Sequence, residues 1–357
     1  MLHKLLPILI LFTGCLDAPF DTQIASPTAT DKKAAPTDTQ TDSVKNVARP
    51  ESLVSMFRSD DLGHCWMPIG DGLPEDLQVA HLDTLGKQIV LASANYGVYL
   101  SDPEKQSWQQ LDTTSLPNLN ITSLHVADGV IYAGVFKQGI YASKDSGKTW
   151  TSLNHNLKDE RVKSILRTGN ELWIGTDRGI YALQDGSKAW RQISNKPQMK
   201  GLLKVGNNFV AGTYEGIALS SNNGETWDVV NRKIKPSKLS VVDGKIIAMD
   251  MGEGLELSAD MGKTWKTIQD GVLHDYQVFE IVKMGNNLMR SQSDGIYMSQ
   301  DWGKTWKDIY HFSFAEPFGI LLTIGEQWNE VYSRPEAAFF ELIVVDGVVY
   351  GGTVRGC

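Results

Sequence analysis

The chain has 357 residues, of which 41% are hydrophobic and 21% charged, and its formal net charge is −8. This acidic balance, 34 basic against 42 acidic residues, argues against a nucleic-acid-binding protein, which needs a basic surface to neutralise phosphates. Three cysteines are too few for a fold held together by disulfides, and no apolar stretch reaches the 18 residues of a membrane-spanning helix. The unusual features are the 33 glycines and 10 tryptophans.

Residues 1–14 are typical of a bacterial export signal, because the apolar stretch from Leu5 to Phe12 is too short to span a bilayer. The stretch closes in the letters FTGC at Cys15, which resembles the lipobox of bacterial lipoproteins. That resemblance implies lipidation of Cys15 and a place on the cell envelope. The outer membrane is favoured over the inner one, because Leu16 is not the Asp that marks inner-membrane retention. A secretory signal that happens to contain a cysteine is the alternative.

Residues 15–50 are predicted to be a disordered tether. They are rich in Thr, Ala, Asp, Pro, Lys and Ser and hold almost no large apolar side chains. Such a segment cannot bury enough apolar surface to offset the entropy lost on ordering. We therefore expect a flexible tether that joins a lipid anchor to a folded domain over residues 51–357.

A tryptophan recurs about every 40 residues in that domain and begins a W-x-x-Φ unit, where Φ is Leu, Ile or Val. The seven are Trp66, Trp108, Trp150, Trp190, Trp227, Trp265 and Trp306. Four of them close the motif S-x-[D/N]-x-G-x-T-W, and the copy that ends at Trp66 differs only in having Cys65 for Thr. The third motif position is occupied by Asp61, Asp145, Asn222, Asp260 and Asp301. Because equivalent copies recur, we interpret these residues as supports of a turn rather than as catalytic or metal-binding groups.

Each unit is predicted to hold four short antiparallel strands, named A to D here. In the unit that ends at Trp190 they cover residues 162–167, 171–176, 180–183 and 189–194. Short turn pairs separate the A and B strands in all seven units, and six of them are Asp-Gly or Asn-containing pairs, which suit two-residue hairpins. The first unit has only its C and D strands, within 54–69, and the last has only A and B, within 340–354. The sequence therefore predicts an all-β, seven-bladed β-propeller whose last blade combines two N-terminal and two C-terminal strands.

These motifs resemble the Asp-box (BNR-repeat) propeller superfamily from Ser52 to Cys357. The group includes sialidases, some glucan-cleaving glycoside hydrolases, the sortilin ectodomain and propellers like the photosystem II stability/assembly factor. The hairpin pattern, with its recurring V-x-D-G and G-I-Y-x-S letters, is most similar to the assembly-factor group. The resemblance implies the fold and leaves the function open, since the superfamily mixes enzymes and binding proteins.

Enzymatic activity receives little support from the sequence. A sialidase would need an early arginine motif, and Arg58 runs instead into the first turn motif. Another glycosidase would need two carboxylates about 5–10 Å apart, which the sequence alone cannot pair. The histidines show no ligand-like spacing, so we predict neither a metal nor another cofactor. Whether Cys65 and Cys357 pair stays open, because the repeat register places them at opposite ends of the strands.

One face of the predicted ring differs from blade to blade. The B–C turns and D–A connections share this variable face, whereas the opposite face carries the uniform A–B turns and Asp-box turns. Variable polar and aromatic residues on a rigid scaffold are typical of a binding surface, and solvated turns are the alternative. The candidate binding residues are Tyr96, Gln138, Arg178, Tyr214, Glu215, Glu253, Asp294 and Arg355.

An apolar insertion at residues 310–337 lengthens one D–A connection and contains Trp328. It is predicted to cap the channel or contact a partner, and a degenerate extra hairpin around Trp328 is the alternative. Taken together, the sequence predicts a monomeric, lipid-anchored propeller that acts as a non-catalytic binding or assembly module. Its partner would be a protein or a glycan, and it would touch the membrane only through its lipid. A carbohydrate-active enzyme, with sialidase activity least favoured, is the alternative.

Overall fold

A computed structural model describes most of the predicted domain. The described residues are 56–64, 66–195, 201–236, 238–250, 254–268, 278–292, 295–311, 313–314, 320–324, 327–331 and 339–354. The predicted signal, Cys15, the tether and five further residues of interest lie outside them, the five being Cys65, Glu253, Asp294, Arg355 and Cys357. Within the described part of the chain, no helix has the length and apolar character needed to cross a membrane.

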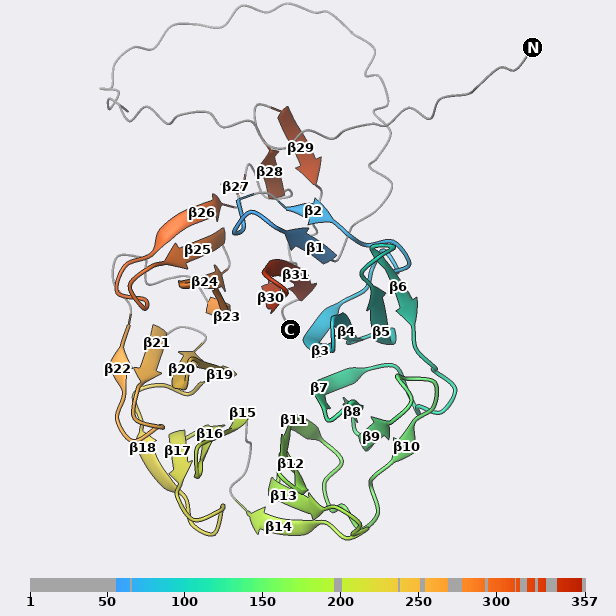
Figure 1. Ribbon diagram of the computed structural model, residues 1–357. Coiled ribbons are helices and arrows are strands. Elements are labelled where there is room, and N and C mark those ends of the chain that lie inside the picture. Colours follow the sequence, from blue (N-terminus) through green and yellow to red (C-terminus); the bar gives the residue numbers. More distant parts are fainter. Residues whose placement is uncertain are drawn as a thin grey trace, which may run out of the picture.

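Seven four-stranded antiparallel sheets form a ring, which confirms the predicted propeller (Figure 1). Blade 1 is β3 (Val79–Leu85), β4 (Gln88–Ser93), β5 (Gly97–Asp102) and β6 (Ser107–Gln110). Blade 2 is β7 (Ile121–Ala127), β8 (Val130–Val135), β9 (Gly139–Ser143) and β10 (Thr151–Ser152). Blade 3 is β11 (Val162–Thr168), β12 (Glu171–Thr176), β13 (Gly179–Gln184) and β14 (Arg191–Ser194). In each blade the first strand lies innermost (Figure 1).

Blades 4 to 6 repeat this arrangement. Blade 4 is β15 (Gly201–Val205), β16 (Asn208–Thr213), β17 (Gly216–Ser220) and β18 (Asp228–Asn231). Blade 5 is β19 (Lys238–Val242), β20 (Lys245–Asp250), β21 (Gly254–Ser258) and β22 (Lys266–Thr267). Blade 6 is β23 (Val278–Met284), β24 (Asn287–Gln292), β25 (Gly295–Ser299) and β26 (Lys307–His311).

Blade 7 closes the ring with strands from both ends of the domain, as predicted. Its strand order is β2 (Met67–Pro68), β1 (Met56–Ser59), β31 (Val348–Val354) and β30 (Phe339–Val345). Strand β1 pairs antiparallel with β31, from Met56 opposite Gly352 to Ser59 opposite Val349. This pairing leaves no open blade edge between the first and last repeats.

The insertion forms a small sheet of its own. Strands β27 (Ser313–Phe314), β28 (Ile320–Ile324) and β29 (Gln327–Val331) pair with one another, and Thr323 lies opposite Trp328. Within its described residues the insertion thus contains the extra hairpin that the sequence left as an alternative.

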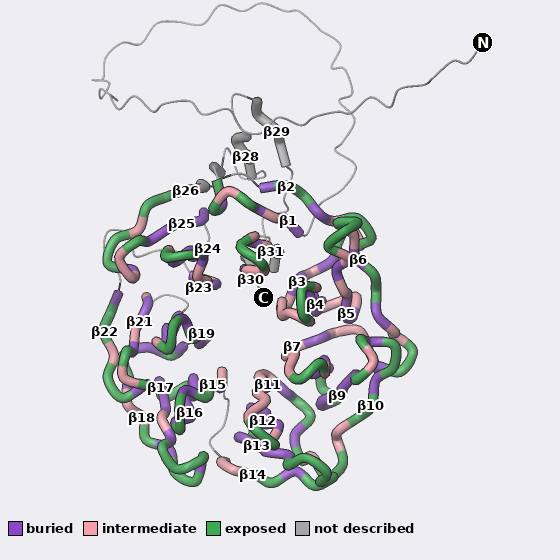
Figure 2. Tube along the Cα trace, in the orientation of Figure 1, coloured by how far each residue is buried: buried purple, intermediate pink, exposed green. Residues whose placement is uncertain are grey.

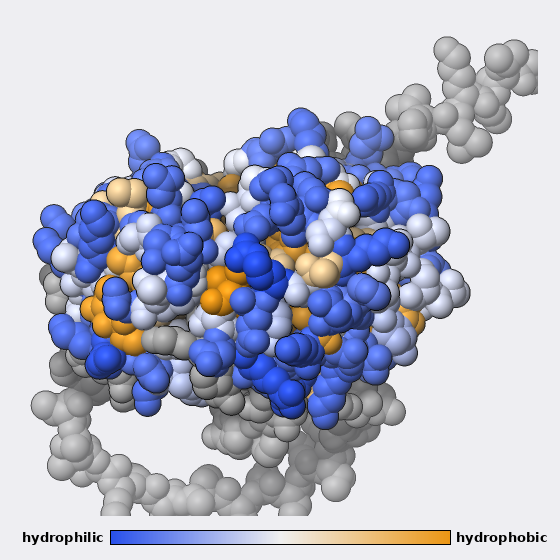
Figure 3. All heavy atoms as spheres, turned by 90° about the horizontal axis from the view of Figure 1, so that it is seen from below, coloured by the Kyte–Doolittle hydropathy of each residue, from blue (hydrophilic) through white to orange (hydrophobic). Residues whose placement is uncertain are grey.

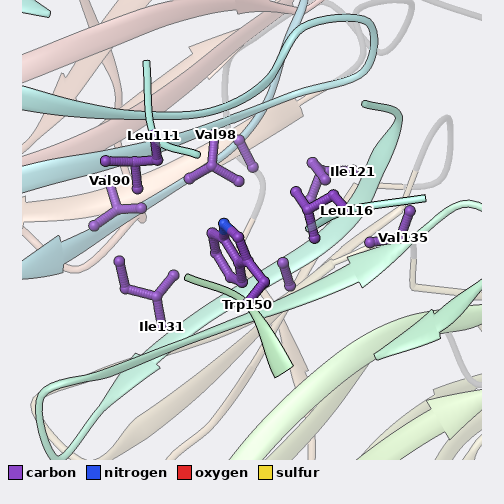
Figure 4. Close-up of a cluster of buried hydrophobic side chains, with 10 residues drawn as sticks. Val90, Val98, Leu111, Leu116, Ile121, Ile131, Val135 and Trp150 are labelled. Carbon is purple, nitrogen blue, oxygen red and sulfur yellow. The ribbon is translucent and has the colours of Figure 1, made fainter. Parts of the chain in front are cut away.

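The hydrophobic core is divided among the interfaces between blades. At the interface of blades 1 and 2, Trp150 lies among Val90, Val98, Leu111 and Ile131 (Figure 4). The outermost strands contribute less, since β10 and β22 are exposed and β14 and β18 are mostly exposed or half-buried (Figure 2). Seen edge-on, the side of the ring in Figure 3 is mainly hydrophilic with small apolar patches.

The Asp-box turn of one blade packs against the Φ residue of the W-x-x-Φ unit in the preceding blade, which explains why the two motifs recur together. A Cβ added to Gly147 of one Asp-box turn would lie 2.2 Å from Cδ1 of Leu111, the Φ residue of the preceding blade. The same close approach, at 3.0 Å or less, recurs for Gly224 with Ile193, Gly303 with Ile268 and Gly63 with Ile309. The glycine thus leaves space for the neighbouring blade, a role that the motif alone does not reveal.

Candidate functional site

The Asp-box side chains are used within their own turns. In blade 2, Thr149 donates to Asp145 through its backbone N (3.0 Å) and its hydroxyl (2.7 Å), and the Ser143 hydroxyl donates to Asp145 Oδ1. Asp260 and Asp301 accept the equivalent bonds. Hydrogen bonds from these threonines lower the pKa of Asp145, Asp260 and Asp301 to about 2.

The Asp-box position of blade 4 shows that a carboxylate is not essential there. Asn222 accepts the same backbone bond, from Thr226 N, at 3.0 Å. Asp61 accepts a bond from the Ser59 hydroxyl at 2.7 Å. These geometries fit a turn support better than a reactive group.

The B–C turns hold the described candidates for binding. Gln138, Arg178 and Glu215 are exposed, and Tyr214 is 46% exposed. Tyr96 differs, because its hydroxyl donates to Asp76 Oδ1 at 2.6 Å and this bond raises the Tyr96 pKa. Trp328, by contrast, lies in β29, away from these turns in the chain.

Blades 2 to 4 present an aromatic and cationic surface on three successive B–C turns. Phe136 is 44% exposed, and the Lys137 ammonium lies 5.0 Å from the centre of its ring. Arg178 and Tyr214 occupy the next two turns. We call Phe136, Lys137, Arg178 and Tyr214 the aromatic arc. Phe136 and Lys137 were not predicted from the sequence, because Phe136 directly follows the apolar residues of β8 and reads as part of that strand.

A ring of equivalent residues lies near the start of the inner strands. It is found by counting four residues back from the last residue of each inner strand, which gives His81, Ser123, Ser164, Gly201, Lys238, Glu280 and Glu341. The next residue along is Leu or Ile in every blade, as expected for one shared register. Inner strands begin on the variable face, so this channel ring lies near the mouth of the channel on that face.

The channel ring is charged on one side only. Lys238 of blade 5 contacts both Glu341 carboxylate oxygens of blade 7, at 2.9 and 2.8 Å. It also forms an ion pair with Glu280 of blade 6. Their side chains are 29% (Lys238), 16% (Glu341) and 8% (Glu280) exposed. Two carboxylates from different blades therefore converge on one ammonium.

This convergence shifts the protonation equilibria of the cluster. Burial raises the pKa of Glu280 to about 7, Glu341 adds to the increase and Lys238 opposes it. Burial alone would lower the pKa of Lys238, but the two carboxylates outweigh it and raise the pKa. Burial lowers the pKa of His81, whose Nε2 lies 3.0 Å from the Thr122 carbonyl oxygen. That oxygen can only accept, so Nε2 carries the proton of the neutral ring.

The cluster can therefore hold a proton or a further cation. One ammonium neutralises only one of two ionised carboxylates, and neutral His81 adds no charge. Among the described residues, no group of three or more His, Cys, Asp or Glu side chains is placed to hold a metal ion.

Family models match parts of the chain. Residues 140–241 match a DUF6242 beta propeller domain, and residues 296–309 match the BNR-Asp box repeat. The second match covers one copy of the turn motif, the one that ends at Trp306. A comparison with curated proteins finds no match.

Solved structures share this propeller's fold at low sequence identity. The extracellular domain of BT4673 from B. thetaiotaomicron is 17% identical (TM-score 0.57), over 71% of this chain and 38% of that one. YCF48 bound to a D1 peptide is 16% identical (TM-score 0.56), over 80% and 96%. An ancestral GH74 enzyme is 15% identical (TM-score 0.58), over 85% and 45%. The propeller thus spans less than half of the BT4673 and GH74 chains, and these likenesses establish the fold alone.

Proposed function

We propose that this propeller is a non-catalytic binding or assembly module that docks a protein partner on its variable face. The observation that carries the proposal is the aromatic arc, where exposed Phe136 and Tyr214 lie on either side of Arg178 in blade order. Aromatic residues and Arg are enriched in protein interfaces and supply much of their binding energy. YCF48, which shares the fold, is known in complex with a peptide, and this supports a protein partner over a glycan.

A carbohydrate-active enzyme is the second candidate, and one observation favours it. A carboxyl group with a pKa of about 7 beside another carboxylate is the pattern of an acid and base pair, as Glu280 and Glu341 display. Against it, Lys238 contacts both carboxylates, whereas glycoside hydrolysis needs them to flank a sugar. Binding is therefore the better supported function.

We further propose that a lipid on Cys15 holds the module on the bacterial envelope, at the outer membrane by preference. The support is the export-signal composition and the FTGC ending of residues 1–15. Metabolic labelling with a palmitate analogue tests this. We expect labelled protein from the native chain and none from Cys15→Ser, while equal labelling of both would exclude lipidation at this residue.

A photo-cross-linking experiment in producing cells tests the docking face. A photoreactive residue is placed at Gln138, on the variable face, or at Glu104, on an exposed turn of the opposite face. We expect a discrete adduct from position 138 alone, identified by mass spectrometry and reproduced with the purified partner. Adducts of equal yield from both positions would refute docking on this face. Turnover of a polysaccharide panel that Glu280→Gln abolishes would instead establish the enzyme.

A further inference from the structure

Resting on the proposed function, we infer that the channel mouth is a recognition site for a basic side chain that the partner inserts. The ligand chemistry is a guanidinium or ammonium group carried on a protein segment. Two separate features support it. Among the described residues, two carboxylates share one cation on one side of the channel ring, and small residues occupy the other side. The aromatic arc belongs to the same blades as these small residues and is suited to the flanking residues of the segment.

Among the described residues, the charged side of the ring holds two carboxylates and one cation. Glu280 and Glu341 share Lys238, and the other described titratable groups beside them add no second positive charge. Burial lowers the pKa of His81 on β3, which keeps its ring neutral. Asp83, two residues further along β3, already accepts a hydrogen bond from Val126 N at 2.7 Å. Asp83 also lies 3.4 Å from Nδ1 of His125 on β7. A second cation near Glu280 and Glu341 would complete the charge balance.

The opposite side of the ring, called the small-residue side here, carries no large side chain at its three ring positions. Ser123, Ser164 and Gly201 of blades 2 to 4 occupy the ring positions there. A Cβ added to Gly201 would meet only Leu239, at 3.6 Å or more, so packing does not require a glycine at this position. The Ser164 hydroxyl oxygen is buried and has no hydrogen-bond partner among the described residues.

The ring lies within reach of a side chain that enters from the variable face. Its members are the first to third residues of their inner strands, which places them at most about 7 Å from the strand starts at roughly 3.3 Å per residue. The small-residue side belongs to blades 2 to 4, whose B–C turns carry the aromatic arc. A segment lying on Phe136 and Tyr214 can therefore direct a long basic side chain toward the two carboxylates.

Two capped peptides test this inference on the full chain by isothermal titration calorimetry. One has the sequence Gly-Tyr-Arg-Tyr-Gly. The other has citrulline in place of the arginine, which keeps nearly the same shape without the charge. We expect the arginine peptide to bind at least about ten-fold more tightly, because removing one partner of a buried charge pair costs more than a factor of ten. Its affinity should rise from pH 6 to pH 8 as Glu280 ionises, whereas that of the citrulline peptide should not.

Substitutions then locate the site. Glu341→Gln should lower affinity for the arginine peptide about ten-fold, while Glu104→Gln on the opposite face should leave it unchanged. Equal affinities of the two peptides for the native chain, or no measurable binding of the arginine peptide at millimolar concentration, would overturn the inference without relying on any variant. A partner adduct at position 138 together with equal peptide affinities would refute the basic-group inference alone. Absence of that adduct would refute the docking function itself.

Discussion

Replacing Gly147 by alanine tests the contact between the Asp-box turn of one blade and the W-x-x-Φ residue of the blade before it. The added Cβ would lie 2.2 Å from Cδ1, 2.8 Å from Cγ and 2.9 Å from Cβ of Leu111. Real side chains do not approach so closely, and Leu111 is itself buried, so blades 1 and 2 must move apart. Overpacking of this kind costs about 1–3 kcal/mol.

The backbone adds a second cost at the same position. Gly147 has φ +83°, a left-handed conformation that costs other residues roughly 1–2 kcal/mol. The two costs together predict a loss of about 2–5 kcal/mol, a large part of the 5–15 kcal/mol of a typical domain. Gly129 is the matched control, since its φ is +74° and a Cβ there would meet nothing within 4 Å. Gly129→Ala therefore loses only the backbone contribution.

Urea unfolding, followed by tryptophan fluorescence, measures both variants. We expect Gly147→Ala to be less stable than Gly129→Ala by about 1–3 kcal/mol, and Leu111→Ala to cost less in the Gly147→Ala background than in the native chain. Equal losses in the two single variants would refute the proposed fit between the motifs.

Three further outcomes follow from the structure. Lys238→Met should cost about 3–5 kcal/mol, because it leaves two buried carboxylates unpaired. The folded protein binds the Glu280 proton more tightly than the unfolded chain does, so the free energy of unfolding falls as pH rises from about 4.5 to about 7. The stability that Lys238→Met loses, measured by urea unfolding, should therefore be greater at pH 8 than at pH 5. Asp145 has a lowered pKa, so its contribution to stability is present above about pH 4 and lost as pH falls toward 2. Asp145→Asn should therefore weaken the fall of the free energy of unfolding in acid. An unchanged pH profile of that free energy would contradict the turn geometry. Deletion of residues 340–357 should abolish cooperative unfolding, whereas a shortened but cooperative ring in calorimetry would contradict closure by both termini.

The repeats made the fold predictable to the level of single strands. In blade 3 the predicted strand over 171–176 coincides with β12, because an Asn-containing hairpin and a glycine mark its two ends. The outer strand was predicted from residue 189 and begins at Arg191, since the degraded turn before Trp190 gives no sharp boundary. The insertion could not be resolved between a loop and a hairpin, because apolar runs of that length suit both.

The candidate site was less accessible from the sequence. Turn residues such as Arg178 were found because blade register fixes which end of the strands they occupy. The channel ring was missed, although counting back from each A–B turn would have produced it. No spacing rule, however, indicates that Lys238 reaches past blade 6 to Glu341, because that contact depends on the width of the closed ring. Phe136 was missed because an exposed aromatic residue beside a strand reads as part of the strand.

The most direct test of the account is the affinity of the purified cross-linked partner for two sets of variants. One carries Phe136→Ser with Tyr214→Ala on the aromatic arc, and the other carries Glu104→Gln with Lys105→Ala on the opposite face. Loss of two interface aromatics should raise the dissociation constant by about ten-fold or more, while the opposite-face variant should bind as the native chain does. Unchanged affinity of the aromatic-arc variant, with weakened binding of the other, would contradict a binding function centred on the variable face.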